Sequence, residues 1–269
     1  MMPPEWKKLK KQPPVRIENL GKIYTGYRGF LKRRRVLALK NLSLTVKKGE
    51  IFGMLGLNAA GKTTLLKILV GFVHPSWGRF EIMGKNTIDL EIKRRLGYLP
   101  EDPKLYEFFS AEEFLLFCGK LFGLNKSERL LRTEKLLETL QITSIARTRI
   151  AELSRGMNQR LAIASSLINE PELIFFDEPL SGLDPIGRKV VKKVILDLKE
   201  KGATVFFSSH ILAEVEQICD RIGILHQGEL LCAEEVKSIL SDFTSLEDFF
   251  FHKIQDAGLR KSQGAGAES

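Results

Sequence analysis

Cysteine is scarce in this chain of 269 residues, and its three cysteines are widely separated. Cys118, Cys219 and Cys232 form no C-x-x-C pair, so the sequence indicates neither a zinc site nor a disulfide framework. Long apolar stretches are also missing, since no uninterrupted run approaches the roughly 18 residues that a membrane-spanning helix needs. The first stretch, MMPPEWKKLKKQPP, is basic and broken by proline, unlike a secretory signal. These absences predict a protein of the cytoplasm.

The composition is typical of a globular protein, with 43% hydrophobic and 28% charged residues. A chain of this length can form one large domain or two modest ones. The net charge of +9 is compatible with nucleic acid or an anionic membrane as a partner. Much of this charge lies at Lys7–Lys11 and in a connector from Arg28 to Arg35. Solvated basic tails and loops explain it at least as well as a binding surface does.

The most informative stretch is GLNAAGKTT at residues 56–64, which matches G-x-x-x-x-G-K-[ST]. It follows the apolar run Ile51–Leu55 and precedes another from Leu65, so the order is strand, loop, helix. Glycines let such a loop curl so that its N–H groups point at one phosphate chain, and the helix start adds partial positive charge. Lys62 would reach the outer phosphates, and the Thr63 hydroxyl would bind Mg²⁺. Taken alone, the loop could also be a ligand-free glycine turn.

Two carboxylates stand at the end of a second apolar run, Leu173–Phe176. Asp177 and Glu178 would lie at the C-terminal end of a buried strand, where parallel sheets bind their ligands. Beside a phosphate loop, Asp177 would hold Mg²⁺ through water and Glu178 would polarise the attacking water. An Asp-Glu-Pro sequence that ends a strand is by itself an ordinary turn. Its pairing with Lys62 favours the catalytic interpretation.

Strand patterns dominate the first part of the chain, and a helical stretch follows. Val15–Leu20 and Val36–Val46 predict strands of a partly exposed sheet, joined by a connector around Tyr27–Arg35. The next expected elements are a strand at Arg79–Met83 with a turn at Gly84-Lys85, a strand at Arg95–Leu99, a helix capped by Ser110 and Glu113, and a helix from about Ser127 to Leu140.

Strands and amphipathic helices alternate in the second half of the chain, which indicates a parallel sheet covered on both faces. From about Gln227 the pattern weakens into short elements, and residues 258–269 are expected to be disordered. The expected elements are Leu173–Phe176, Gly187–Glu200, Thr204–Phe207, Ile211–Cys219, Arg221–Leu225 and Glu234–Leu240.

Two further segments are LSRGMNQR at residues 153–160 and Ser208-Ser209-His210. Together with the phosphate loop and Asp177-Glu178, these segments form a series of motifs along the chain. In this series the chain resembles the ATP-binding subunit of an ABC transporter, over about residues 15–232. The resemblance implies ATP and Mg²⁺ as cofactors and a dimer of ATP-binding subunits that closes over two ATP molecules. It also implies membrane-spanning permease subunits on separate chains, and a peripheral position on the cytoplasmic face of the membrane.

The family has an α/β fold, a P-loop NTPase (RecA-like) core with an N-terminal antiparallel β subdomain and an inserted α-helical subdomain. The resemblance places the ATP-binding domain at residues 15–235 and the helical insert at about 101–168. Residues 236–269 would form a short C-terminal extension.

The resemblance also assigns roles to single residues. Lys62, Glu178 and His210 would be catalytic, with His210 on the γ-phosphate, and Thr63, Glu101 and Asp177 would serve the metal. Tyr24 would stack on adenine. Ser154 and Gly156, before a helix expected from Asn158, would form a second anion site that faces the other subunit's phosphate loop. The full set of expected ATP contacts is Tyr24, Gly56, Leu57, Asn58, Ala59, Ala60, Gly61, Lys62, Thr63, Thr64, Ser154, Gly156 and Asp184.

Four positions depart from the family pattern. Ala59 and Arg155 stand where glycine is usual, Glu101 replaces the glutamine of the Q-loop, and Met157 is also atypical. The Ala59 methyl would strain the loop if this position needs a positive φ angle. These variants, and the short C-terminal end, look like those of exporter subunits for drugs, lipids or polysaccharides.

The Q-loop and the start of the insert, Glu101 to Leu124, would receive a coupling helix of the permease. Tyr106, Phe108 and Phe109 would line that groove, whereas Phe114 and Phe117 are expected in the core of the insert.

Two alternatives remain. One is a soluble mechanical ATPase that acts on nucleic acid or ribosomes, but such relatives usually carry two cassettes, coiled coils or zinc insertions, so no nucleic-acid partner is expected. The other is a non-hydrolysing partner subunit, which Ala59 and Glu101 keep open. The sequence does not specify the cargo, the direction of transport, the permease or whether the dimer is homomeric.

Overall fold

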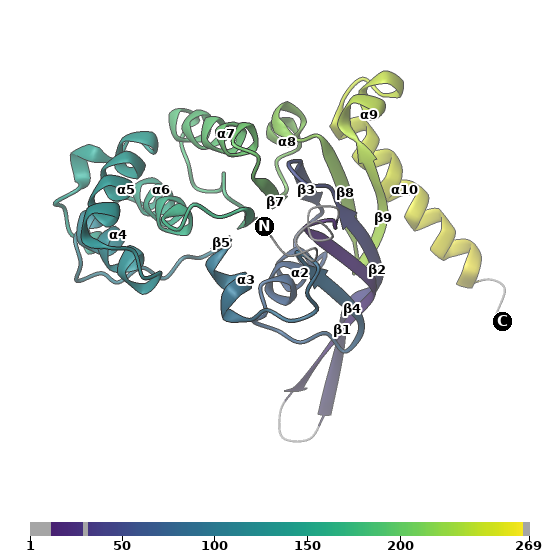
Figure 1. The fold of residues 1–269 in the computed structure, drawn as a ribbon. Coiled ribbons are helices and arrows are strands. Elements are labelled where there is room, and N and C mark those ends of the chain that lie inside the picture. The colour runs from purple at the N-terminus through teal and green to yellow at the C-terminus, as the bar shows by residue number, and fades with distance from the viewer. Residues whose placement is uncertain (1–11, 29–31, 266–269) are drawn as a thin grey trace, which may run out of the picture. The chain divides into compact units, whose positions relative to one another are not determined.

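The computed structural model describes residues 12–28 and 32–265 (Figure 1). It divides into two units. The first comprises the chain up to Asn86 together with the part from Ser208 onward, and the second runs from Thr87 to Phe207. Each unit is described separately below.

A three-stranded antiparallel sheet opens the first unit. It consists of β1 (Val15–Arg28), β2 (Lys32–Val46) and β4 (Trp77–Ile82) in the order β2-β1-β4. Val15 and Ile17 are buried while Arg16 between them is exposed, because successive residues of a strand point to opposite faces. After Ile82, a bridge to Lys85 closes the turn expected at Gly84.

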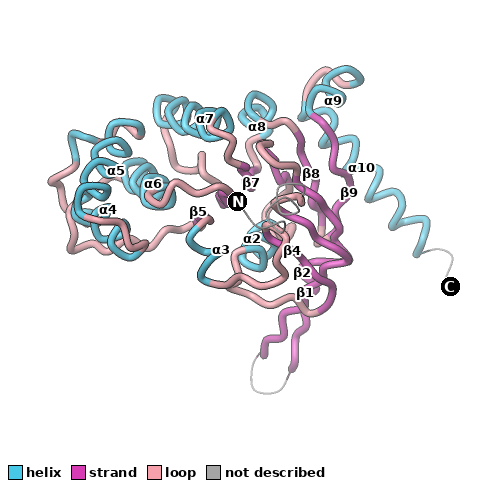
Figure 2. The backbone as a smooth tube through the Cα atoms, viewed as in Figure 1, coloured by secondary structure: helices cyan, strands magenta, loops and turns pink. Residues whose placement is uncertain are grey.

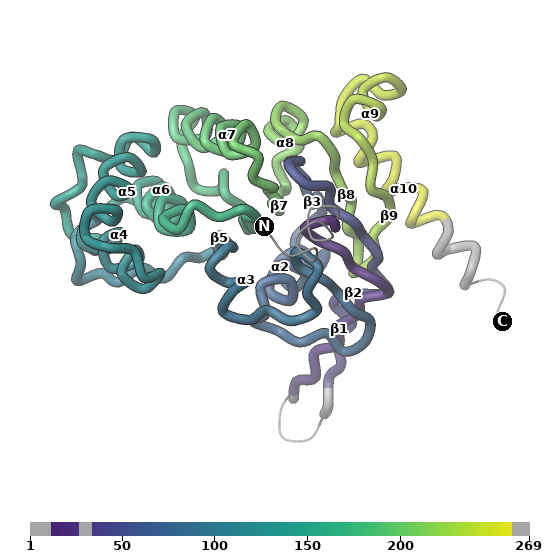
Figure 3. Tube along the Cα trace, in the orientation of Figure 1, coloured from purple at the N-terminus to yellow at the C-terminus, as the bar shows by residue number. Residues whose placement is uncertain are grey.

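The expected connector at Tyr27–Arg35 is wrong, because β1 and β2 stay paired as a two-stranded ribbon beyond the end of β4. The register runs from Tyr24 opposite Val36 to Arg28 opposite Lys32, and residues 29–31 lie outside the described part. Figure 3 shows the two strands running side by side along the described part of the ribbon. The cations do not prevent pairing, since an exposed ribbon leaves charged side chains in water while its backbone bonds continue. Arg34 and Arg35 are indeed exposed.

The strand that feeds the phosphate loop is β3 (Ile51–Leu55), which is buried along its whole length. It pairs in parallel with β8 (Arg221–His226), and α2 (Lys62–Leu69) and α8 (Leu212–Ile218) belong to the same unit. Near-continuous apolar strands of this kind are covered on both faces.

The weak pattern expected after Gln227 conceals a strand, β9 (Glu229–Glu235), which pairs antiparallel with β8. Gln227 and Gly228 have φ angles of 48° and 82° and form the tight turn between the two strands. Such turns need two left-handed residues, which glycine adopts readily. The sequence expectation missed this strand because its residues are only half-buried and carry three glutamates.

The expected disorder from Gly258 is also wrong for the described residues. After α9 (Val236–Asp242), helix α10 runs from Leu246 to Ala265. Leu246, Phe249 and Phe250 are buried, and Glu216 of α8 accepts a hydrogen bond of 2.8 Å from the Leu246 N–H. Packing of this first turn provides an anchor from which the helix continues.

Helices make up most of the second unit (Figure 2). They are α3 (Leu90–Arg94), α4 (Ala111–Leu121), α5 (Lys126–Thr139), α6 (Arg155–Leu167) and α7 (Pro185–Glu200), with short 3-10 turns at Thr143–Ile145 and Ile150–Glu152. Strand β5 (Leu96–Leu99) pairs in parallel with β6 (Leu173–Asp177), and the chain leaves the unit along β7 (Thr204–Ser209).

The helix starts of the insert follow local chemistry. The expected capping box of Ser110 and Glu113 is confirmed at the start of α4. Helix α5 begins one residue earlier than expected, because Asn125 and Glu128 form a second capping box there. Phe114 is buried as expected, and Phe117 is half-buried. Across residues 12–28 and 32–265, none of the helices combines the length and the apolar character that crossing a membrane requires.

Candidate functional site

The loop between β3 and α2 depends on its glycines. A Cβ atom on Gly56 would lie 2.4 Å from the carbonyl oxygen of Leu225, and one on Gly61 would lie 2.5 Å from that of Ala38. Gly61, which precedes α2, also has a φ angle of 113°. Both contacts are with backbone atoms that cannot move aside, so only glycine fits at either position.

Lys62 is the first residue of α2, and its side chain folds back into the loop. Its Nζ donates hydrogen bonds to the carbonyl oxygens of Gly56, at 2.6 Å, and Leu57, at 3.4 Å. The residue is only 7% exposed. A buried ammonium group is costly unless charge or hydrogen bonds compensate it, so this position is prepared for an anion.

The start of α2 has the properties of an anion-binding helix end. Among the described residues, no side chain caps this end and its first turn holds no acidic residue. Thr63 and Thr64 lie half-exposed in that turn. The uncapped N–H groups and the helix dipole therefore favour a negatively charged ligand at the loop.

Ala59 adopts a φ angle of 63°, so this position does need the left-handed conformation. Its methyl group is exposed, as are Leu57 and Asn58, whereas Ala60 is buried. The Ala60 carbonyl oxygen accepts a 2.9 Å hydrogen bond from the N–H of Gly228 in the β8–β9 turn. The backbone of the phosphate loop is thus strained at Ala59 and fixed by a hydrogen bond at Ala60.

Two other expected site residues belong to the first unit. His210 is exposed directly after β7, where the Ser209 hydroxyl accepts a 3.0 Å hydrogen bond from the Ile211 N–H and shapes the turn. Tyr24 lies on the ribbon and is 38% exposed, with the Lys22 ammonium 5.0 Å from its ring centroid. That cation occupies one approach to the ring that was expected to stack on adenine.

The two carboxylates of the second unit end strand β6. Asp177 is fully buried, and Glu178 is 7% exposed with a φ angle of 54°. Burial and, to a smaller extent, the charge of Asp177 raise the pKa of Tyr98 to about 12. The Asp177 charge is therefore felt within the strand pair β5–β6.

Gln159 of α6 holds the turn at Glu178, a role that sequence reasoning missed. Its side-chain nitrogen donates to the carbonyl oxygens of Glu178, at 3.5 Å, and Pro179, at 3.3 Å. Gln159 is itself buried. The sequence did offer one signal for this role, a polar residue on the inner side of an amphipathic helix. A buried amide there needs hydrogen-bond partners.

The segment at residues 153–160, which matches the family's signature motif, forms the start of α6, which begins at Arg155 and not at Asn158 as expected. Ser154 is the N-cap, and its Oγ accepts a 3.3 Å hydrogen bond from the Met157 N–H. The earlier start arises because this serine satisfies the first turn. Gly156 consequently lies inside that turn.

Arg155, which replaces a family glycine, lies against Gly182 in the segment Ser181–Asp184, which matches the family's D-loop. A Cβ on Gly182 would be 2.7 Å from the Arg155 Nε, and Gly182 has a φ angle of 73°. Asp184 caps α7 by accepting a 2.7 Å hydrogen bond from the Gly187 N–H. The structure thus brings the signature and the D-loop together within one unit.

The expected docking region also lies in the second unit. Glu101 is exposed after β5. Tyr106 and Phe108 are 51% and 69% exposed, and their ring centroids lie 5.8 Å apart. Phe109 packs beside Phe108 at 4.5 Å. Exposed aromatic clusters of this kind are uncommon unless a partner covers them.

Thr63 and Asp177 each carry an oxygen donor of the kind that Mg²⁺ prefers. In the described part of the chain, no three His, Cys, Asp or Glu side chains gather into a metal site. Mg²⁺ in nucleotide sites needs no such cluster, since it takes one or two protein oxygens and completes its shell with water and phosphate. The Thr63 hydroxyl and the Asp177 carboxylate are donors of the right kind.

Comparisons with known proteins agree with one another. The family model described as ABC transporter matches residues 39–181. An ABC transporter ATP-binding protein of Synechocystis is 46% identical over 239 residues, which is 86% of this chain and 67% of that protein. The bacitracin transport ATP-binding protein BcrA of Bacillus licheniformis is 42% identical over 72% of this chain and 63% of its own length.

Solved structures show the same fold. The ATP-binding subunit of an ABC transporter covers 89% of this chain and 99% of its own, with a TM-score of 0.77 and 30% identity. A dimeric ATP-binding cassette in a post-hydrolysis state, bound to ADP and Pi, covers 82% of this chain and 98% of its own, with a TM-score of 0.75 and 26% identity. The α/β fold is therefore that of a P-loop NTPase, and the chain belongs to the ABC transporter family as one of its ATP-binding proteins.

Proposed function

We propose that this ATP-binding protein hydrolyses ATP and powers transport through separate membrane-spanning permease subunits, to which it binds on the cytoplasmic face of the membrane. The observation that carries the proposal is the buried Lys62 ammonium, which bonds to the Gly56 carbonyl oxygen beside an uncapped helix end. A loop with this arrangement favours a polyphosphate. The ATP-binding domain would span residues 15–235, with its helical insert at about 101–168.

Each catalytic group has a role that suits its chemistry. Lys62 would exchange its carbonyl partners for oxygens of the outer phosphates, and Thr63 and Asp177 would hold Mg²⁺. Bound Mg²⁺ would neutralise phosphate charge. Glu178 would accept a proton from the attacking water, and His210 would contact the γ-phosphate. These assignments follow the family's use of matching positions.

Dimerisation would complete each site. Because the Ser154 oxygen already accepts the Met157 N–H, its own hydroxyl proton stays available for a phosphate oxygen of the partner's nucleotide. Gly156 would bring its N–H to the same ligand. Asp184 caps α7 through one carboxylate oxygen, which leaves the other for contact across the dimer.

Export is the direction that the relatives support. Two of them are named for bacitracin transport and for linearmycin resistance, at 42% and 39% identity. We propose a permease for drugs, lipids or polysaccharides. Its coupling helix would cover the exposed rings of Tyr106 and Phe108.

Steady-state ATPase assays of the wild type and of Glu178→Gln test this function. The wild type should turn over ATP, and the variant should bind ATP, accumulate as a nucleotide-trapped dimer on size exclusion and lose nearly all turnover. Glu134→Gln, an exposed change on α5, is the matched control and should behave as wild type. A wild type that binds ATP without turnover would instead identify a non-hydrolysing partner subunit. ATPase stimulated only by nucleic acid would indicate the mechanical ATPase.

A further inference from the structure

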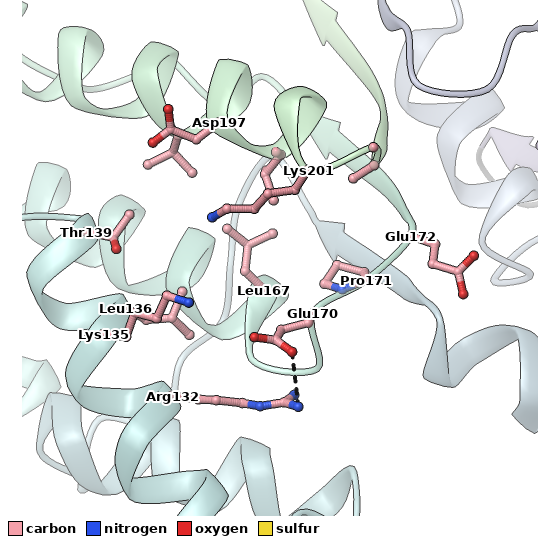
Figure 4. Close-up of a pocket in the computed structure, with 14 residues that line it drawn as sticks. Arg132, Lys135, Leu136, Thr139, Leu167, Glu170, Pro171, Glu172, Asp197 and Lys201 are labelled. Carbon is pink, nitrogen blue, oxygen red and sulfur yellow. Dashed lines mark ion pairs between the residues drawn. The ribbon is translucent and has the colours of Figure 1, made fainter.

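A cavity of about 370 Å³ opens in the second unit, away from the residues assigned above (Figure 4). Its size falls in the range of small-molecule sites, roughly 300–1,000 Å³. Its apolar lining comes from α5, α6, α7 and the segments that precede β6 and β7, and consists of Leu136, Leu167, Pro171, Val194, Leu198 and Ala203.

The cavity lies at the far ends of two helices that begin in the signature and the D-loop. Leu167 is the last residue of α6, whose N-cap is Ser154, and Leu198 is near the end of α7, whose N-cap is Asp184. At a rise of about 1.5 Å per residue, the 13 residues of α6 put the cavity about 20 Å from Ser154. A ligand here would not compete with a nucleotide at the signature.

The rim of the cavity carries charges of two kinds. Some are already neutralised, since Arg132 pairs with Glu170 at 3.1 Å and Glu172 pairs at 2.8 Å with Arg95, which lies outside the lining. The others are two lysines, Lys135 on α5 and Lys201 after α7. In the part of the chain that the structure describes, neither lysine forms an ion pair. In Figure 4 the Lys201 side chain extends above Leu167, whereas Lys135 lies beside Leu136 on the other side of the cavity.

We infer that this cavity binds an amphipathic organic anion, with its apolar body on the Leu167 floor and its acidic group attracted to the rim by the charges of Lys135 and Lys201. Two ammonium groups against the single unengaged carboxylate of Asp197 leave a net positive rim. Such a rim attracts a sulfonate, carboxylate or phosphate, and the apolar floor selects ligands that also carry an aromatic or aliphatic body.

A pair of fluorescent dyes tests the inference on the full chain. Anilinonaphthalene sulfonate has both features, and phenylnaphthylamine has nearly the same apolar body without the charge. The sulfonate dye should bind at one saturable site, and the double change Lys135→Gln and Lys201→Gln should weaken it about fivefold or more. The neutral dye should change by less than about twofold. Asp197→Asn should tighten the sulfonate dye, because it removes the opposing charge.

Controls separate this site from the rest of the molecule. Lys189→Gln removes the same charge from an exposed position on α7 outside the cavity and should leave both dyes unaffected. Saturating ATP should not displace the dye, and a Lys62 variant that has lost ATP binding should retain it, so a failure of the proposed ATPase function leaves this test intact. The inference would be overturned if ATP displaced the dye or if no saturable site were found. It would also be overturned if both dyes lost affinity equally, or if the Lys189 control lost as much affinity as the double variant.

Discussion

The ammonium group of Lys62 donates a 2.6 Å hydrogen bond to the carbonyl oxygen of Gly56, six residues earlier in the chain. The loop therefore closes around its own cation. A phosphate oxygen is a stronger partner than a neutral carbonyl, because both charges of the new bond contribute. Ligand binding would exchange one set of bonds for a better one.

Lys62→Met should weaken ATP binding by about 10-fold to 100-fold, since a hydrogen bond to a charged group contributes roughly 1.5–3 kcal/mol. The free energy of unfolding without nucleotide should change little, because the lost bonds and the relieved burial of charge oppose each other. Equilibrium binding of a fluorescent ATP analogue and thermal unfolding measure the two effects. Lys67→Ala, at the other end of α2, should keep full affinity.

Ala59→Gly should stabilise the protein by about 0.5–1 kcal/mol. The φ angle of 63° costs alanine about 1–2 kcal/mol, and the larger entropy that glycine loses on folding offsets part of this gain. ATP affinity and turnover should rise with the relaxed loop. Ala60→Gly is the matched control: its φ angle is not positive and its methyl is buried, so this change should destabilise. Unchanged affinity and turnover in Ala59→Gly would show that the methyl is harmless.

Gln159→Met should lower turnover more than it lowers ATP affinity. The change keeps the volume of the side chain but deprives the carbonyl oxygens of Glu178 and Pro179 of their donor, at a cost of about 1–3 kcal/mol. Glu178 would then lose support for its left-handed backbone. Turnover should be expressed per ATP-binding site, counted by nucleotide titration, because a merely structural role would reduce the number of sites and leave the turnover of each remaining site unchanged.

Tyr98 should ionise with a pKa of about 12, well above the ordinary tyrosine value. Because burial raises this pKa above its unfolded value of 10.0, the associated stability is present below pH 10 and is lost as the pH rises toward 12. Tyrosinate absorbance during an alkaline titration measures the pKa. Tyr98→Phe should remove the step near pH 12, and Asp177→Asn should lower the pKa of Tyr98 because it removes a nearby negative charge.

Local signals made much of this fold predictable. The capping box of Ser110 and the apolar run before Gly56 depend on neighbours in sequence, so their helix and strand follow directly. The strand β9 was missed because its half-buried residues carry little periodicity. Contacts such as that of Arg155 with Gly182 join residues that are distant in sequence, and no local pattern reports them.

The turn at Gln227-Gly228 is remote in sequence from the phosphate loop, yet the turn packs directly against this loop. The Gly228 N–H bonds to the Ala60 carbonyl oxygen, and its own carbonyl oxygen accepts from Lys40 on β2 at 2.8 Å. A Cβ there would approach the Ala38 carbonyl oxygen to 2.9 Å. The β8–β9 turn thus supports the phosphate loop from outside. Lengthening this turn by a single residue would weaken ATP binding without changing any residue that contacts the nucleotide.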